Sequence, residues 1–280
     1  GHDTEQWSTE TRQRPALPEC ALGDPPAPDP DPAPEIPAPL PPSYDPPVVE
    51  IFETARWFEA LKTWKKGERE TIFKDGAHNR KIGGDITVGD LRGAYLVTLS
   101  LEERATCPTS CAAWVICYGN NMNRARRWNF TPELIEGMET ELAWLCANYP
   151  GVMVRLHVLG DFASPEYLDF WDRMLGTHKN LFCFGFTAHR PRTAGGERIA
   201  AIRRKYRGPF AVRSRFAIRH SDTAGDWGSE IIETIPEEQS NSAVICPEQM
   251  DSIDRNARQT HCGSCAICWQ SDRNIQFLEH

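Results

Sequence analysis

Between residues 50 and 245, short apolar runs alternate with longer segments whose apolar positions recur every three or four residues. The runs have the length of buried strands, and the longer segments have the spacing of one-sided helices. The expected strands are 94–99, 152–158, 181–187, 210–216 and 243–245, and the expected helices are 50–64, 131–148, 164–175 and 197–206. Such alternation is typical of a parallel sheet covered by helices. We therefore predict an α/β fold, an incomplete (β/α) barrel with mostly parallel strands.

Residues 1–48 differ in composition from the rest of the chain. They contain 14 of the 22 prolines, and nine acids against two bases give them a net charge of −7. A segment of this kind lacks the apolar residues of a packed core, so we expect an acidic, disordered tail, either a tether or a docking segment. The expected organisation is this tail, a (β/α) core domain at 49–245 and a cysteine-rich segment at 246–280.

The charge of the remaining residues excludes one broad class of protein. Removing −7 from the total of −8 leaves −1, so the expected folded part lacks the overall positive field of a protein that coats nucleic acid. The longest apolar run, 93–101, is too short to cross a bilayer, and the first residues do not resemble a secretory signal. We expect a soluble, cytoplasmic protein that does not bind membranes.

The ten cysteines are not spread along the chain as disulfide staples would be. Six of them form two tight groups, Cys107/Cys111/Cys117 and Cys262/Cys265/Cys268. Cysteines this close in sequence favour a shared metal centre over disulfides, which remain the alternative. Cys146 and Cys183 have apolar neighbours typical of core residues, and Cys20 lies in the tail.

The first group has the spacing C-x3-C-x5-C and follows the expected strand 94–99 directly. Three thiolates can hold three irons of a [4Fe-4S] cluster and leave the fourth iron open, whereas a structural zinc ion needs a fourth protein ligand. No histidine lies in this loop. Parallel α/β folds build their active sites at the carboxyl ends of strands, where this loop is expected.

Polar residues also lie at the ends of the next expected strands, at the same edge of the expected barrel as the cysteine loop. The two-residue period places Arg155 and His157 on one face, directed at the lumen, and Gly160-Asp161 follows them. His189 ends the following expected strand, and Arg215 ends the one after, where it could bind a carboxylate or phosphate. The alternative for Gly160-Asp161 is an ordinary turn, and for His189 a surface position.

A strand, a three-cysteine loop with an aromatic residue at Tyr118, and alternating strands and helices resemble the radical S-adenosylmethionine enzymes. Their commonest spacing is C-x3-C-x2-C, and here it is longer. The resemblance implies that Cys107, Cys111 and Cys117 bind a [4Fe-4S] cluster whose open iron takes S-adenosylmethionine. It also implies that Gly160 and Asp161 receive the methionine amino group of that cofactor.

A second resemblance is to the phage and prophage family called gene product 88. It rests on Cys107-Pro108, Cys117-Tyr118, the pattern Arg155-x-His157-x-x-Gly160-Asp161-Phe162, and a final Cys-x2-Cys-x2-Cys-Trp that is followed by Phe277-x-x-His280. It covers roughly residues 90–280 and implies no particular reaction.

The second cysteine group has the spacing C-x2-C-x2-C with small residues between the thiols. Cys246, sixteen residues earlier, is a plausible fourth ligand, and His261 and His280 compete with it. Four thiolates suit a structural zinc ion and a second iron–sulfur cluster equally. A purely structural role at the carboxyl-terminal end of the domain is the simplest interpretation.

The densest basic run is Arg124-Ala125-Arg126-Arg127-Trp128. Arginine with tryptophan can grip phosphates and stack on bases, so this run is a candidate nucleic-acid contact. A solvated helix face is the alternative.

These observations favour an iron–sulfur enzyme of the radical S-adenosylmethionine type, with Arg155 and Arg215 as further cofactor contacts. Its unknown substrate would lie near His157, Asp161 and His189, and it would need an electron donor. One rival is a zinc protein with two structural sites that binds nucleic acid or another protein. A second rival is a metal-dependent transferase that modifies nucleic acid.

Overall fold

The computed structural model describes residues 60–279 except 115–116, 123, 209–212, 237–240 and 254–259. The expected tail, most of the expected helix 50–64, and His280 lie outside these residues.

The core is an eight-stranded sheet in the order β2-β3-β5-β6-β7-β8-β10-β9. β2 is antiparallel to β3, and every other pair of neighbours is parallel. The strands are β2 (Lys74–Asp75), β3 (Tyr95–Thr98), β5 (Val152–Leu156), β6 (Leu181–Thr187), β7 (Phe216–Ser221), β8 (Gly228–Ile232), β9 (Ala243–Ile245) and β10 (Asn274–Leu278). A separate two-stranded parallel sheet joins β1 (Leu61–Lys62) to β4 (Arg127–Trp128).

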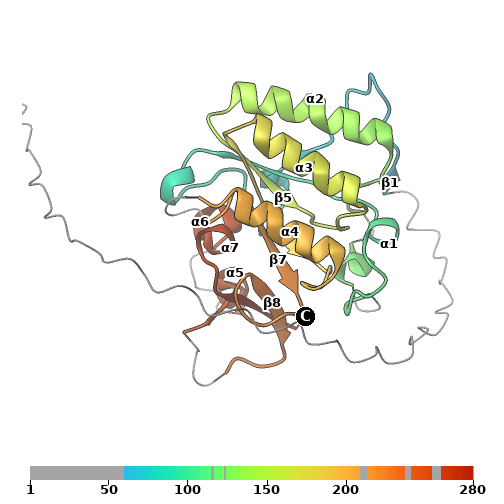
Figure 1. The fold of residues 1–280 in the computed structure, drawn as a ribbon. Helices are drawn as coiled ribbons and strands as arrows, with labels where there is room; N and C mark the ends of the chain where they lie inside the picture. Colours follow the sequence, from blue (N-terminus) through green and yellow to red (C-terminus); the bar gives the residue numbers. More distant parts are fainter. Residues whose placement is uncertain are drawn as a thin grey trace, which may run out of the picture. The chain divides into compact units, whose positions relative to one another are not determined.

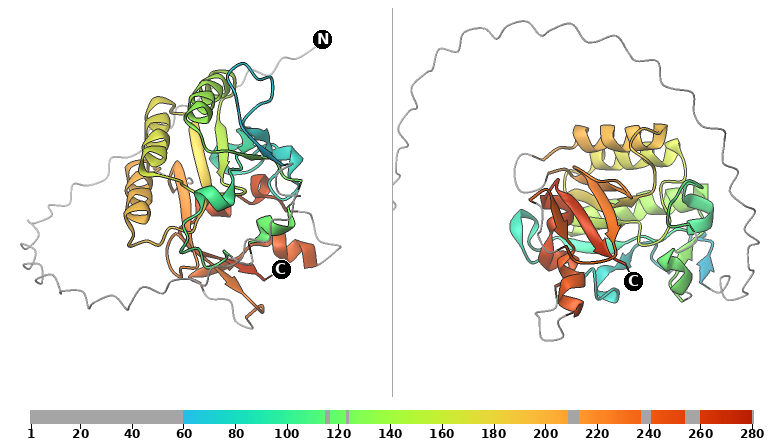
Figure 2. Two further views of the ribbon diagram at one scale, coloured as in Figure 1. Left: turned by 90° about the vertical axis from the view of Figure 1, so that its right-hand side faces the viewer. Right: turned by 90° about the horizontal axis from the view of Figure 1, so that it is seen from below.

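Three long helices cover one face of the large sheet (Figures 1 and 2). They are α2 (Pro132–Asn148), α3 (Pro165–Thr177) and α4 (Ala194–Lys205). Each begins after a hydroxyl side chain that accepts a hydrogen bond from the first turn, namely Thr131, Ser164 and Thr193. Because strands and helices alternate and neighbouring strands from β3 to β7 follow chain order, the predicted α/β class with a mostly parallel sheet is confirmed.

The opposite face of the sheet is covered by segments from both ends of the described chain (Figure 2). These are the segment with the 3-10 helices η1 (Gly76–His78) and η2 (Gly89–Leu91), and the short helices α6 (Cys262–Cys265) and α7 (Ile267–Gln270). Trp269 packs there among buried residues of the strands, with its ring centroid 4.7 Å from that of Phe184. The face that would line a barrel lumen is therefore filled by the carboxyl-terminal cysteine segment.

Three shorter helices complete the described elements: α1 (Glu103–Thr106), η3 (Tyr118–Asn121) and α5 (Pro247–Ile253).

The boundary predictions for β1 and β7 were wrong. Residues 61 and 62, expected at the end of a helix, form β1. Of the strand expected at 210–216, residues 210–212 lie outside the described residues, and β7 runs from Phe216 to Ser221 and contains the buried polar residues Arg219 and His220. Arginine and histidine made this segment look unlike a buried strand, and the apolar residues just before it drew the prediction toward them.

Candidate functional site

The first cysteine group lies at the carboxyl edge of the sheet, in the loop between β3 and α2. Cys107, Cys111 and Cys117 are half-buried, and none of them forms a disulfide. Burial raises the pKa of the Cys107 thiol, and the nearby charges of Asp161, Cys111 and Cys117 raise it further. Asp161 lies next to the start of this cysteine segment, because its amide donates to Oγ1 of Thr106, the residue before Cys107, at 3.1 Å.

A buried ion pair holds this loop in place. Arg127 donates two hydrogen bonds to Glu103, with Nε–Oε2 2.7 Å and Nη2–Oε1 3.1 Å, and both side chains are 3% exposed. The same guanidinium donates to the carbonyl oxygens of Gly119, Met122 and Ala125. One arginine therefore joins α1, before the first cysteine, to the chain that follows the third.

Asp161 is 2% exposed and lies between the segments that follow β5 and β6. Its carboxylate accepts hydrogen bonds from Thr187 Oγ1 (2.7 Å), from the amide of Ala188 (2.6 Å) and from its neighbour Phe162 (2.8 Å). Burial raises the pKa of this carboxyl, against the effects of His189 and these hydrogen bonds. Asp161 thereby joins the end of β5 to the end of β6 and lies within electrostatic reach of Cys107.

Gly160 allows the segment after β5 to approach the segment between β3 and the first cysteine closely. Its φ is +87°, and a Cβ there would lie 2.8 Å from both Leu101 Cβ and Thr106 Oγ1. Thr106 in turn accepts the amide hydrogen of Asp161 at 3.1 Å. Glycine at this position is therefore required by the packing of the β5 exit on the cysteine loop.

The expectation that Arg155 and His157 share one face was wrong. β5 ends at Leu156, so the two-residue alternation does not reach His157. His157 is buried on the helix side, where its Nε2 lies 3.0 Å from Tyr167 Oη, and burial next to the charge of Arg155 lowers its pKa to about 3. Arg155 lies on the opposite face, over the rings of Phe184 and Phe186.

His189 lies at the carboxyl edge of the sheet, two residues after the end of β6, as expected. Its Nε2 lies 2.9 Å from the carbonyl oxygen of Phe162, which makes that nitrogen the proton donor. His220 Nδ1 donates to the carbonyl oxygen of His189, also at 2.9 Å. The other nitrogen of His220 is buried without a hydrogen-bond partner among the described residues.

Arg215 does not belong to this mouth, which corrects the prediction that it binds cofactor there. It precedes β7 and lies at the amino edge of the sheet, the edge opposite the cysteine loop. Its guanidinium donates to the carbonyl oxygens of Leu175 and His178 at the end of α3. Its contacts are those of a residue that closes a helix end.

The second cysteine group is brought together with Cys246, the fourth ligand expected from the sequence. Burial raises the pKa of Cys262 and raises that of Cys268 to about 12, and the charges of Cys246 and Cys265 act on both thiols in the same direction. Lys81 connects the two segments, because its carbonyl oxygen accepts the amide hydrogen of Cys262 at 2.9 Å and its Nζ lies 3.5 Å from Oε2 of Glu248, two residues after Cys246. The buried side chain of Trp269 anchors this segment on the sheet.

Two arginines face this second group from the sheet. Arg155 is near enough to Cys262 and Cys268 for its charge to oppose the effect of burial on both thiols. Arg219 is 0% exposed and donates to the carbonyl oxygens of Cys268 (3.1 Å), Arg273 (2.7 Å) and Ser271. It forms no ion pair within the described part of the chain, although the charge of Asp272 acts on it.

The described residues contain no three Cys, His, Asp or Glu side chains arranged as they are around a bound metal ion. His261 precedes Cys262, and its Nδ1 is buried without a hydrogen-bond partner among these residues. No disulfide links any of the nine described cysteines. The two groups therefore bring thiols near one another without the closed geometry of an ion site.

The basic run at 124–128 lies largely inside the fold. Arg127 and Trp128 are buried, and Trp128 Nε1 donates to the carbonyl oxygen of Ile72. Arg126 pairs with Glu70 at 2.9 Å, which leaves Arg124 as the exposed cation of the run. A nucleic acid could reach Arg124 in this structure, but not Arg127 or Trp128.

Sequence reasoning missed Glu103, Arg219 and His220. Glu103 carried a usable signal, since it is an acid in a short segment directly before a cysteine loop that ends in a run of arginines. Arg219 and His220 gave no local signal, because their partners are distant in sequence: Arg219 contacts residues 268–273, and His220 contacts His189.

The fold and the site together define an α/β protein with one group of cysteines at the carboxyl edge of a mostly parallel sheet. A second group of cysteines lies on the face opposite α2, α3 and α4. No family model matches the chain, and no solved structure matches it. The chain is similar to the Gene 88 protein of Mycobacterium phage L5, with 24% identity over 227 residues that cover 70% of this chain and 90% of the relative. This is a distant similarity to a phage protein. In the described residues, no helix has both the length and the apolar character needed to span a membrane.

Proposed function

We propose that this protein is an iron–sulfur enzyme of the radical S-adenosylmethionine type, with its catalytic cluster at Cys107, Cys111 and Cys117. The observation that carries the proposal is the position of these three free thiols in one segment at the carboxyl edge of a mostly parallel sheet, where the amide of buried Asp161 donates to Thr106, the residue before Cys107. This edge is where parallel α/β enzymes place their chemistry.

The three thiols are chemically suitable ligands for such a cluster. Three thiols approach one another without a disulfide, and the loop between them offers no fourth cysteine or histidine. A cluster held by three thiolates keeps one iron available to an external ligand. When bound, the cluster and S-adenosylmethionine would supply a radical that abstracts hydrogen from a substrate.

The residues around the thiols would orient ligands and exclude water. Asp161 is already held by Thr187 Oγ1 and the Ala188 amide, so its carboxylate can present a fixed negative charge to an amino group near Cys107. His189, fixed through Phe162, borders the same mouth. Buried His157 is separated from the mouth by its place beside Tyr167, so its role would be to pack the β5 exit.

The test is anaerobic purification with measurement of iron, sulfide and zinc, followed by a cleavage assay with S-adenosylmethionine and dithionite. The wild-type chain is expected to contain about four irons at the first group and to release 5′-deoxyadenosine. A Cys107→Ala/Cys111→Ala/Cys117→Ala variant should lose this iron and the cleavage, while the control Cys146→Ala should retain both. Wild-type protein without iron, or a triple variant that keeps its iron, would refute the proposal.

A second candidate function, zinc-dependent stabilisation by Cys246, Cys262, Cys265 and Cys268, has its own support. Cys262 and Cys268 belong to the segment that packs on the face opposite the long helices, Cys246 follows the edge strand β9, and the charges of Arg155 and Arg219 oppose the negative charge of a four-thiolate centre. A divalent ion with four thiolates carries a net charge of −2, which two guanidinium groups would balance. Stoichiometric zinc that disappears in a Cys262→Ala/Cys265→Ala/Cys268→Ala variant would support this role, and iron with sulfide at the same residues would exclude it.

A further inference from the structure

A cavity of about 510 Å³ lies between β2, the start of β3 and the carboxyl-terminal half of α2. Cavities of this size bind small organic molecules. Tyr95, the first residue of β3, lines the cavity, whereas the first cysteine loop follows the other end of this strand. The cavity is therefore separate from the proposed catalytic site.

Three aromatic side chains line this cavity together. Tyr95 and Tyr149 are stacked, with their ring centroids 4.4 Å apart. Trp144 meets Tyr149 edge to face, with centroids 6.3 Å apart and an angle of 71° between the ring planes. Trp144 is 58% exposed, so a ligand can reach its ring. The faces of aromatic rings carry negative π charge and attract cations, and tryptophan attracts them most strongly.

Asp75 adds a carboxylate on the same face of the sheet. It lies opposite Val97 in the register of β2 and β3, so its side chain is on the face that carries Val97 and Tyr95. Its Oδ1 accepts the amide hydrogen of Ala77 at 2.8 Å, which fixes the carboxylate at the start of η1. Asp75 forms no ion pair with another described residue. Burial, together with the charge of Asp75 and a hydrogen bond to it, raises the pKa of Tyr95 to about 12.

Glu141 brings a second carboxylate to the cavity from α2. Its Oε2 accepts the amide hydrogen of Ile72 at 2.7 Å, and its Oε1 accepts that of Phe73 at 3.1 Å. These bonds hold the segment before β2 against the helix. Burial raises the pKa of Glu141, and the two amides and the charge of Arg126 oppose this effect. A cation in the cavity would stabilise the charged form of Glu141 further.

The basic side chains of the lining are less favourably placed for a ligand. Arg126 pairs with Glu70 at 2.9 Å. Lys74 and His78 are exposed, and the alternation along β2 directs Lys74 away from the face that carries Asp75. The described groups beside the aromatic rings therefore favour a cation over an anion.

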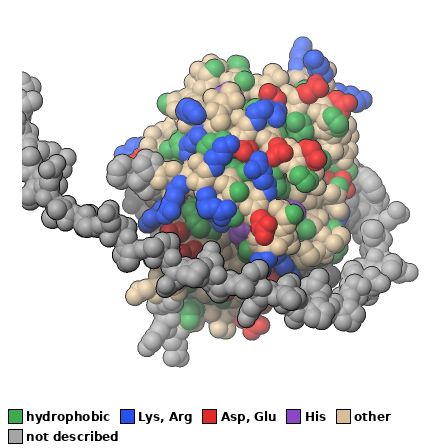
Figure 3. All heavy atoms as spheres, in the orientation of Figure 1, with side chains coloured by type: hydrophobic (Ala, Val, Ile, Leu, Met, Phe, Trp, Pro, Cys, Tyr) green, Lys and Arg blue, Asp and Glu red, His purple; other side chains and the backbone are tan. Residues whose placement is uncertain are grey.

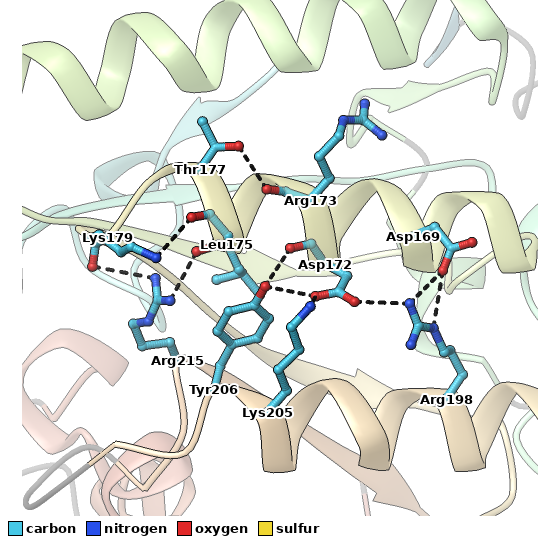
Figure 4. Close-up of polar contacts among 11 residues, drawn as sticks. Asp169, Asp172, Arg173, Leu175, Thr177, Lys179, Arg198, Lys205, Tyr206 and Arg215 are labelled. Atoms are coloured by element: carbon cyan, nitrogen blue, oxygen red, sulfur yellow. Dashed lines mark hydrogen bonds and ion pairs between the residues drawn. The ribbon is translucent and has the colours of Figure 1, made fainter.

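The acids on the face that carries α3 and α4 are arranged differently. Figure 3 shows lysine, arginine, aspartate and glutamate side chains interspersed on this face. Asp172 accepts hydrogen bonds from Lys205 (2.7 Å) and Arg198 (3.0 Å), as Figure 4 shows. Asp169 accepts one from Arg198 at 2.7 Å. A ligand cation would compete there with arginine and lysine, whereas Asp75 has no such partner among the described residues.

We propose that this cavity binds a small organic cation, a protonated or methylated amine, with its charged nitrogen beside the rings of Trp144 and Tyr149 and the carboxylate of Asp75. Cation–π attraction is stronger in a partly desolvated cavity than on an open surface. The buried side chains of Phe73 and Val97 would contact the apolar part of the ligand. The inference does not depend on the metal content of either cysteine group.

The test compares calorimetric binding of choline to the full chain with that of its neutral isostere dimethylbutanol, in which carbon replaces the charged nitrogen. Choline is expected to bind at least about tenfold more tightly, because only the cation gains from the rings and the carboxylate. Trp144→Leu and Asp75→Asn should each weaken choline binding at least about threefold, and Trp144→Phe should retain most of it. The matched control Asp169→Asn removes one carboxylate charge from the face in Figure 4 and should bind like wild type.

Several results would overturn the proposal. These are no saturable binding of choline, equal binding of choline and dimethylbutanol, equal losses in Asp75→Asn and Asp169→Asn, or a preference for adenosine monophosphate, which probes for an anion site. Unchanged thermal unfolding of the variants establishes that a loss of binding comes from the cavity. If Asp75→Asn unfolds, the comparison of Trp144→Leu with Trp144→Phe still decides, because Trp144 is exposed and equal binding by these two variants would exclude the ring as a ligand contact.

Discussion

Arg127 and Glu103 form a two-point ion pair that is almost completely shielded from water and lies directly behind the first cysteine loop. Its partners on both sides of the loop make it an internal restraint on the position of the three thiols. Arg127, which the sequence suggested as a nucleic-acid contact, instead lies inside the fold and holds the loop that carries the candidate metal ligands.

Replacing Arg127 with Met should lower the free energy of unfolding by about 3–5 kcal/mol, because Glu103 would keep its charge without a partner. Urea denaturation measures this effect. Metal at the first group should fall with it, and metal at the second group should not. A Glu103→Gln/Arg127→Met double variant should recover part of the stability. If the single variant is as stable as wild type, the pair does not hold the loop.

Replacing Arg219 with Met should destabilise the carboxyl-terminal segment. The carbonyl oxygens of Cys268, Ser271 and Arg273 would lose a charged donor, at a cost of about 3 kcal/mol. Arg219→Lys should rescue little, because one ammonium group cannot reach three carbonyl oxygens in fork geometry. Hydrogen exchange of residues 262–273 should rise in both variants, and unchanged protection would contradict the assigned role.

Asp161→Asn should weaken the connection between the exits of β5 and β6. The amide that replaces Oδ2 would turn a donor toward the Ala188 amide, which is also a donor, at a cost of about 1–3 kcal/mol. If the side chain orients ligands as proposed, S-adenosylmethionine should bind more weakly to the variant even where it remains folded. Calorimetric titration at a temperature well below unfolding separates the two effects, and unaltered binding would leave Asp161 with a structural role alone.

The contact between α3 and α4 should make stability depend on acid pH through Asp172. Burial raises the pKa of this carboxyl, but hydrogen bonds from Lys205 and Tyr206 outweigh burial and leave it below its ordinary value of 3.8. A depressed pKa contributes stability that is complete above about pH 4 and is lost as pH falls below that value. Asp172→Asn should thus lose stability at pH 6 and show a smaller further loss at pH 3 than wild type. Tyr206→Phe should cost about 1 kcal/mol at pH 6. Parallel pH profiles for wild type and Asp172→Asn would exclude this origin.

The sequence was sufficient for the elements that carry local signals. The start of α2 was predictable because Thr131 and Pro132 specify a helix start by themselves, and β6 was predictable from an unbroken apolar run. The sequence also indicated Cys246 as a companion of the second cysteine group, and the structure brings it there.

Partners distant in sequence were not predictable. The side of the sheet that His157 occupies depends on where β5 ends, and the burial of Arg127 depends on Glu103, 24 residues earlier. The wrong prediction for Arg215 came from an error of a few residues in the expected bounds of β7. Because β7 begins at Phe216, Arg215 lies at the amino edge of the sheet and not at the carboxyl edge. Charged and aromatic residues show which interactions are possible, whereas tertiary packing selects the one that forms.

β10 lies between β8 and β9 although it follows both in the chain. During translation, neither of these strands can meet its common neighbour until residues 274–278 have left the ribosome. The cysteine segment at 262–268 emerges before that moment, so its thiols reach the solvent of the cell while this part of the sheet is still incomplete. If this segment binds metal as proposed, metal loading would compete in time with completion of the sheet, and the order of the two events could be followed by stalling synthesis before and after β10.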